Sequence, residues 1–154
     1  MYTIFFSSHG IVSQLPCESG KAVTATFFTE QVLPNLIKNI EKYRPKTGTR
    51  AMKILNDNAG SHTAKLTINF LAVEGLELLP HPPHSPDLAP CDFWLFPKPK
   101  IYLQGKDFNT LQALGAGLYH YFKSIPEEDY RNVFYKWVEG CKFVYLQEGI
   151  PLSK

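Results

Sequence analysis

The chain has 154 residues, enough for one domain of ordinary size with a buried core. Its 44% hydrophobic and 19% charged residues are typical of a globular protein and exclude a disordered one. A net charge of +2 is too small to indicate a nucleic-acid partner by itself. No stretch approaches the roughly 20 apolar residues of a membrane span, so no membrane partner is expected. An odd count of three cysteines, without a secretion signal at the N-terminus, favours reduced thiols in an intracellular compartment.

The first third of the chain predicts a hairpin followed by a helix. Residues 2–7 and 11–15 are rich in β-forming side chains, and Ser8-His9-Gly10 between them suits a tight turn. Residues 24–43 carry apolar side chains at steps of one, three and four, which indicate an amphipathic helix. Pro34 must kink or restart that helix.

The middle of the chain predicts a parallel strand–helix–strand unit. Residues 51–56 form a short apolar strand that delivers Asp57 at its carboxyl end. Ser61 or Thr63 is expected to cap a following helix of about 12 residues, which Gly75 ends. Residues 76–79 form the next strand, and connections this short favour a right-handed crossover.

The last part of the chain predicts a rigid loop and then helices. Residues 80–90 contain five prolines, which exclude strand pairing and fix where the next element starts. Asp92 stands at or near the first turn of that element, where a helix N-terminus favours a carboxylate. Residues 111–125 and 126–141 repeat apolar side chains at helical spacing. The order of elements indicates an α/β fold with a mixed sheet flanked by helices.

Asp57 and Asp92 are the candidate metal ligands, with 34 residues between them. Two carboxylates that face one open groove can hold divalent cations beside a phosphodiester, and ligation by oxygen alone favours Mg²⁺ or Mn²⁺. Spacing alone leaves another interpretation open. Asp57 could begin an Asx turn with Asn58 and Gly60, and Asp92 could be a helix N-cap.

Two segments resemble the catalytic domain of mariner-type transposases, which have an RNase H-like fold. The matching residues are ILNDNA followed by His62, and HPPHSPDLAPCDFWLFP over residues 81–97. The resemblance implies metal-dependent DNA cleavage and strand transfer, with Asp57 and Asp92 as catalytic metal ligands. It also implies DNA as partner, residence in the nucleus and no small-molecule substrate. By this resemblance residues 1–142 are a partial catalytic domain without its first strand, and residues 143–154 are a divergent tail.

The same resemblance implies a third carboxylate on an earlier strand, and this sequence has no evident candidate. The acids before Asp57 are Glu18, beyond the second expected strand, and Glu30 and Glu41, on the expected helix. Two carboxylates leave a cation loosely placed, so we expect weak metal binding and negligible DNA cleavage by this chain alone. The helix-turn-helix domains of the family are also missing, which implies an N-terminal truncation. An unpaired strand edge would favour a homodimer.

Two other functions stay open: a non-catalytic DNA- or protein-binding module derived from a transposase, and a product without a selected role. Other interpretations of single residues are weaker. A zinc cluster would use His62, His81, His84 and Cys91, whose spacing matches no standard finger. Asp87 is expected to satisfy backbone donors in a turn.

The residues after Asp92 also have two interpretations. Lys98, Lys100 and Lys106 suit either a DNA backbone or a solvated helix face. The aromatic side chains Phe93, Trp94 and Phe96 could stack on bases but are expected in the core.

Overall fold

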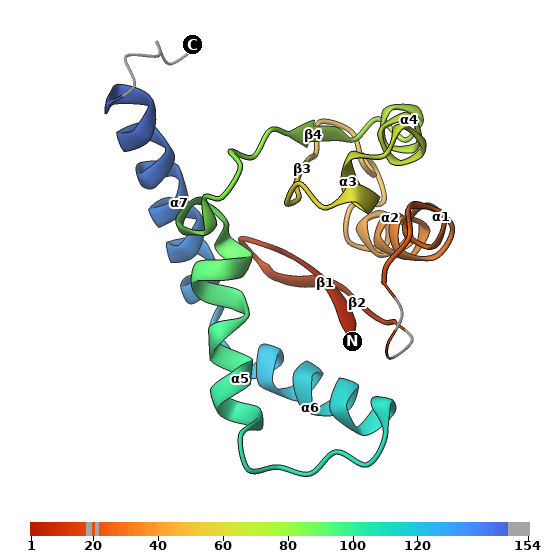
Figure 1. The fold of residues 1–154 in the computed structure, drawn as a ribbon, viewed down its shortest axis with the longest axis vertical. Helices are drawn as coiled ribbons and strands as arrows, with labels where there is room; N and C mark the ends of the chain where they lie inside the picture. The colour runs from red at the N-terminus through yellow and green to blue at the C-terminus, as the bar shows by residue number, and fades with distance from the viewer. Residues whose placement is uncertain (18–19, 21, 148–154) are drawn as a thin grey trace. The chain divides into compact units, whose positions relative to one another are not determined.

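The computed structural model describes residues 1–17, 20 and 22–147 (Figure 1). These residues form two compact units. The first unit combines Met1–Phe6 with Ile11–Pro83. The second unit combines Ser7–Gly10 with the described residues from His84 onward. Asp57 therefore belongs to the first unit and Asp92 to the second.

The expected hairpin is present. Strands β1 (Tyr2–Ser7) and β2 (Gly10–Pro16) pair with each other, and only Ser8 and His9 connect them. Gly10 has a φ of 127°, which residues with a side chain rarely adopt. The hairpin is therefore as short as its sequence predicts.

The expected helix of residues 24–43 consists of three segments: α1 (Ala25–Phe27), the π-helical η1 (Phe28–Val32) and α2 (Leu33–Tyr43). The Thr24 hydroxyl caps the first segment by accepting from the Phe27 amide at 3.1 Å. A proline in a regular helix lacks the amide donor and clashes with the carbonyl four residues earlier. The wider π turns end at Val32, directly before α2, so Pro34 lies in the first turn of α2, where it is tolerated.

The expected parallel strand–helix–strand unit is also present. Strand β3 (Lys53–Leu55) pairs in parallel with β4 (Glu77–Leu79), with Lys53 opposite Glu77 and Leu55 opposite Leu79. The connection contains α3 (Gly60–Thr63) and α4 (Lys65–Val73).

The expected cap at Ser61 or Thr63 is wrong. The helix breaks at Ala64, whose ψ of 141° is extended, and no side chain caps α4. The Thr63 hydroxyl instead donates to the Ala59 carbonyl within α3. The Thr67 hydroxyl donates to the Ser61 carbonyl at 2.6 Å, and this bond joins the two short helices.

The first unit has one hydrophobic core. The buried stripe of η1 and α2 packs with Ile54 of β3, Leu71 of α4 and Leu76, which directly precedes β4. Side chains of the hairpin, Phe5, Val12 and Leu15, pack against the same cluster. Helices and strands thus share one core, and the expected α/β class is confirmed. The four strands form two separate pairs, β1–β2 and β3–β4.

The second unit is helical apart from the hairpin tip. It contains the 3₁₀ turn η2 (Pro86–Leu88), the π-helical η3 (Cys91–Leu95), α5 (Pro97–Leu103), α6 (Leu111–Ser124) and α7 (Glu127–Gln147). The Thr110 hydroxyl caps α6 by accepting from the Ala113 amide at 3.0 Å. The expected C-terminal helices are confirmed. Because α7 continues to Gln147, the tail expected at residues 143–154 begins inside a helix, and residues 148–154 lie outside the described part.

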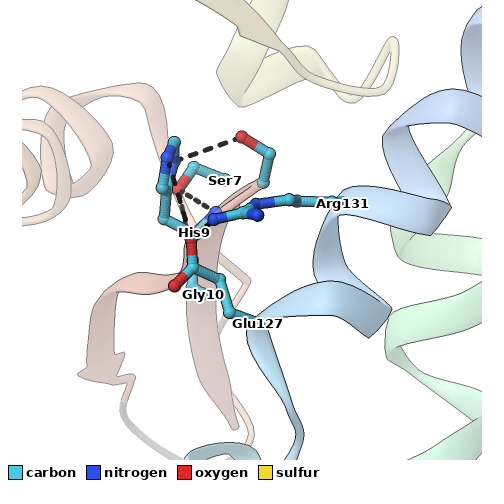
Figure 2. Close-up of polar contacts among 6 residues, drawn as sticks. Ser7, His9, Gly10, Glu127 and Arg131 are labelled. Atoms are coloured by element: carbon cyan, nitrogen blue, oxygen red, sulfur yellow. Dashed lines mark hydrogen bonds and ion pairs between the residues drawn. The ribbon is translucent and has the colours of Figure 1, made fainter.

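The hairpin tip contacts the first turn of α7 within the second unit (Figure 2). The His9 Nε2 atom lies 3.9 Å from a carboxylate oxygen of Glu127, which also pairs with Arg131 one helical turn later. The His9 and Glu127 side chains are 75% and 47% exposed, so these ion pairs contribute little stability. No helix in the described residues is both long enough and apolar enough to span a bilayer.

Candidate functional site

Asp57 lies two residues beyond the end of β3, as the sequence predicts, and its side chain is 63% exposed. Its Oδ1 atom accepts a hydrogen bond from the Ala59 amide at 3.1 Å. The same oxygen lies 2.6 Å from Nδ1 of His62. The local turn that the alternative interpretation required is therefore present, although it uses Ala59 rather than Gly60. This turn leaves most of the carboxylate in solvent.

His62 links Asp57 to the core of the first unit. The imidazole is only 21% exposed, and its ring centroid lies 4.6 Å from that of Phe28, a core residue. The neighbouring Asn58 donates its side-chain amide to the His81 carbonyl at 3.0 Å. The loop after β3 is thus held at two points, and both contacts to the Asp57 carboxylate fall on one oxygen. That geometry orients the Asp57 carboxylate and leaves its second oxygen, Oδ2, available to a ligand.

Asp92 is an exposed residue in the first turn of η3, where the sequence places it. Its amide donates to the Ala89 carbonyl at 2.8 Å. The N-cap of η3 is Pro90, and no side-chain bond caps it, so the interpretation of Asp92 as an N-cap is wrong. A carboxylate in a first helical turn is stabilised by the positive end of the helix.

The pairing of Asp57 with Asp92 stays a prediction, because the two residues belong to different compact units. Within residues 1–17, 20 and 22–147, no group of three or more His, Cys, Asp or Glu side chains could hold a metal ion. Glu30 and Glu41 are exposed residues of η1 and α2, and Glu18 lies outside the described part. The described acids therefore contain no third ligand beside Asp57.

The chemistry of the two aspartates fits a hard divalent cation. Each offers exposed carboxylate oxygens, which Mg²⁺ and Mn²⁺ prefer, and each lies at the end of a secondary-structure element. Mg²⁺ usually keeps several waters and takes only one or two protein carboxylates. The histidines and the cysteine of the zinc interpretation form no group of three or more metal-binding side chains among the described residues.

Asp87, Lys100 and Lys106 are exposed, whereas Lys98 is half-buried. Asp87 is exposed in the 3₁₀ turn η2. Lys98 lies over the ring of Trp94, with 4.5 Å between its Nζ atom and the ring centroid, and Lys106 lies 3.3 Å over Tyr102. These two lysines are therefore partly ordered by aromatic rings rather than freely solvated.

The expectation that Phe93, Trp94 and Phe96 are core residues is wrong for two of them. Phe93 and Phe96 are 36% and 49% exposed, whereas Leu95 between them is fully buried. The π-helical turn of η3 changes the angle per residue, so helical spacing assigns these side chains to the wrong face. Trp94 is half-buried and packs edge-on against Tyr130, with 5.1 Å between ring centroids.

The sequence did not predict the contact between Asp57 and His62, because His62 entered only as part of the family resemblance and as a possible zinc ligand. The available signal was the spacing of five residues between a strand-end carboxylate and a histidine in the next short helix. That spacing alone does not predict the contact, because the contact also needs the turn at Ala59 and the short helix that ends at Ala64.

Known proteins are similar to almost the whole length of this chain. No family model matches the chain. The mariner Mos1 transposase of Drosophila mauritiana is 28% identical over 151 residues, which are 97% of this chain and 44% of that protein. The human histone-lysine N-methyltransferase SETMAR is also 28% identical over 97% of this chain, which spans only 20% of SETMAR. This chain thus spans less than half the length of both curated relatives.

Solved structures agree with the sequence relatives. The crystal structure of the Mos1 mariner transposase catalytic domain superposes with a TM-score of 0.82 at 25% identity, covering 99% of this chain and 82% of that one. The Mos1 mariner paired-end complex with Mn superposes with a TM-score of 0.84 at 27% identity, covering 97% of this chain and 44% of that one.

The mixed α/β elements and these superpositions define an RNase H-like fold. Within that class, sequence and structure agree on one group of relatives. The chain is a homologue of the mariner-type transposases and aligns with their catalytic domain, as the two sequence segments predict.

Proposed function

We propose that this chain is a transposase-derived nucleic-acid-binding domain that holds Mg²⁺ or Mn²⁺ through Asp57 and Asp92 and does not cut DNA by itself. The observation that carries the proposal is the similarity to the Mos1 transposase over 97% of the chain. Mos1 structures described as a paired-end complex with Mn and as a pre-cleavage transpososome support DNA and a divalent cation as its ligands.

The residues around Asp57 support its assignment as a metal ligand. A ligand carboxylate needs a fixed orientation, and hydrogen bonds to its non-ligating oxygen commonly provide it. The Ala59 amide and His62 both contact Oδ1 of Asp57, and no described residue bonds Oδ2. Asp57 would therefore present Oδ2 to the cation. When bound, the cation supplies charge stabilisation to a phosphodiester oxygen.

The absence of cleavage follows from the number of ligands. Phosphoryl transfer depends almost entirely on positioning and charge stabilisation, which a loosely held cation provides poorly. Among the described residues no third acidic or histidine ligand joins either aspartate. The chain alone would thus bind a cation weakly, with water completing most of its coordination shell.

Calorimetric titration with Mn²⁺ tests the metal assignment. We expect weak binding by the wild-type chain and none by the Asp57→Ala/Asp92→Ala double variant. Asp87→Ala is the matched control, because it removes an exposed acid from the same segment as Asp92. Equal binding by the wild-type chain and the double variant would remove both aspartates from the proposal.

A nicking assay on supercoiled DNA with Mg²⁺ or Mn²⁺ tests the proposed lack of cleavage. We expect no nicking above background by the wild-type chain. Nicking that disappears in Asp57→Ala would contradict that expectation and make this chain a nuclease.

A non-catalytic module for binding DNA or a protein partner is the second candidate, favoured by the lack of a third described ligand. A gel-shift measurement across salt concentrations discriminates the candidates. Salt-sensitive DNA binding that needs no metal supports a DNA-binding module, and absence of DNA binding leaves the protein-binding module as the only one of these candidates. Residence in the nucleus and a homodimer belong to the same proposal. Imaging of a tagged chain would test the nuclear residence. Light scattering of the purified chain would test the homodimer.

A further inference from the structure

The second unit contains a pocket of about 190 Å³ that no part of the proposed metal chemistry uses. One wall comes from η3 and α5, and the other from the first turns of α7. The α7 residues follow one helix face, since they are spaced by three, four and seven positions. The lining residues are Trp94, Lys98, Asp129, Asn132, Val133 and Lys136.

The apolar part of this pocket packs on buried side chains. Trp94 packs against the ring of Tyr130, which is only 2% exposed and donates its hydroxyl to the Phe122 carbonyl at 3.0 Å. Val133, also 2% exposed, lies one helical turn after Asp129. The pocket therefore presents an indole whose position is fixed by buried neighbours. A fixed aromatic side chain is a platform for a flat heteroaromatic ring.

Cations border the aromatic wall. The Nζ atom of Lys98 lies 4.5 Å from the centroid of the Trp94 ring, and Lys136 lines the pocket from α7. Lysine binds phosphate as a point charge, so these ammonium groups can bind a phosphate beside the ring. The combination matches a ligand that joins a flat ring to a phosphate.

Asp129 and Asn132 give the pocket a polar edge. A carboxylate accepts hydrogen bonds and cannot donate them, so it favours a base with an amino group. Cytosine offers such a group at N4, whereas thymine offers a carbonyl oxygen at the same position. Asn132 both donates and accepts, so it can pair with either base.

We propose that this pocket binds one unpaired nucleotide. Trp94 contacts the base, Lys98 and Lys136 bind the phosphate, and Asp129 favours cytosine over thymine. The inference deepens the proposed nucleic-acid binding and rests on it for its biological setting. It also ties that binding to the candidate metal ligand, because Trp94 and Asp92 belong to the same short helix, η3.

The first test compares short cytidine and thymidine deoxyoligonucleotides of equal length, by fluorescence anisotropy with the full chain in EDTA. We expect about tenfold tighter binding of the cytidine strand, because a hydrogen bond to a charged acceptor is among the strong ones. Asp129→Ala should bind both strands equally. A cytidine preference that survives Asp129→Ala, or no preference in the wild-type chain, would overturn the assignment of Asp129. Since no metal is present, failure here is distinguishable from failure of the metal proposal.

The second test uses the lysines. Lys98→Ala and Lys136→Ala should weaken both strands and each lower the salt slope of binding by about 0.7. Lys142→Ala is the matched control, because it makes the same charge change on α7 but pairs with Glu139 and does not line the pocket. Equal weakening by all three variants would mean that charge alone attracts the strand, and would overturn the pocket.

The third test reads Trp94 directly and identifies the source of the nucleotide. The sequence has two tryptophans, so a Trp137→Phe variant leaves Trp94 as the only one. We expect the cytidine strand to quench its fluorescence. Quenching by deoxycytidine monophosphate at a similar affinity would identify a site for free nucleotides, and quenching by the strand alone would identify a strand site. Absence of quenching by both ligands would overturn the proposal.

Discussion

The Asp57 carboxylate is oriented by one backbone amide and one imidazole, which meet the same oxygen. The amide comes from the local turn, whereas the imidazole is held by its packing against Phe28 in the core. A residue that contacts a ligand rather than the metal acts as a positioning residue, and its loss typically lowers metal affinity.

His62→Phe separates this positioning role from packing. Phenylalanine keeps a ring against Phe28 but cannot bond Asp57, so we expect about tenfold to hundredfold weaker Mn²⁺ binding. The melting temperature should change little by comparison. Calorimetric titration and thermal unfolding of the same samples measure the two effects. His84→Phe, in the exposed proline loop, is the control, and equal Mn²⁺ binding by wild type and His62→Phe would contradict the role.

Tyr130 predicts a pH dependence of stability. Burial, and then the nearby Tyr121, raises the pKa of Tyr130 to about 12 from the ordinary value of 10.0. Between pH 10 and about 12 the folded chain therefore keeps this proton while the unfolded chain loses it. The stabilisation from this group is fully present below pH 10 and is lost as the pH rises toward 12. In that window the free energy of unfolding should fall by about 1.4 kcal/mol per pH unit through this group.

Tyr130→Phe should remove that share of the slope. It should also lower stability at neutral pH by about 1 kcal/mol, because the Phe122 carbonyl loses the hydroxyl donor and keeps the Ile125 amide. Urea unfolding at several pH values between 8 and 12 measures both effects. Tyr135→Phe, at a side chain exposed to 72%, controls for the loss of a phenol. An unchanged slope in Tyr130→Phe would contradict the prediction.

At the scale of elements, the end of α4 decides where β4 begins. The Gly75 amide donates to the Ala72 carbonyl at 3.2 Å and the Leu76 amide to the Leu71 carbonyl at 2.9 Å, which is a Schellman motif. Leu71 and Leu76 are both buried in the core, as the hydrophobic contact of that motif requires. The next amide, that of Glu77, already bonds the Met52 carbonyl beside β3. One glycine thus ends the helix and aligns the following strand.

Gly75→Ala should destabilise the chain by about 1–2 kcal/mol, because Gly75 has a φ of +69°. A methyl group there would meet no atom within 4 Å, so the cost is conformational and not steric crowding. Gly60→Ala is the matched control: it also has open space but no positive φ, and should be neutral or slightly stabilising. Chemical unfolding of both variants measures the difference. Equal stability of the two variants would contradict a conformational cost at Gly75.

At the scale of the whole molecule, stability in the first unit depends on a single apolar cluster that joins η1, α2, β3 and α4. Leu33 is fully buried at the junction of the π-helical segment and α2. Shortening a side chain at such a position removes apolar contacts and also leaves a cavity.

Leu33→Ala should lower the free energy of unfolding by about 2–5 kcal/mol. Leu66→Ala makes the same change at a side chain that is 51% exposed, and should cost less than about 1 kcal/mol. Thermal or urea unfolding followed by far-UV circular dichroism measures both. A similar loss in both variants would mean that Leu33 is not a core residue in solution.

The sequence by itself determined the local elements and the relatives of this chain. The hairpin, the parallel strand–helix–strand unit ending at Gly75 and the C-terminal helices follow from short-range patterns, because periodicity and turn residues act between near neighbours. The ILNDNA sequence that contains Asp57 and the SPDLAP sequence before Asp92 likewise indicate a resemblance to the mariner-type transposases. The sequence also places Asp57 and Asp92 at element ends, and their role as metal ligands stays a prediction.

Only the tertiary structure decided which side chains meet. The π-helical turns before Pro34 and at η3 alter the angle between successive residues, so helical spacing misassigned Phe93 and Phe96. Spacing in the sequence predicts neither the contact of His62 with Asp57 nor the pocket between Trp94 and α7. Contacts of that kind depend on packing between elements, where burial and geometry outweigh local propensity.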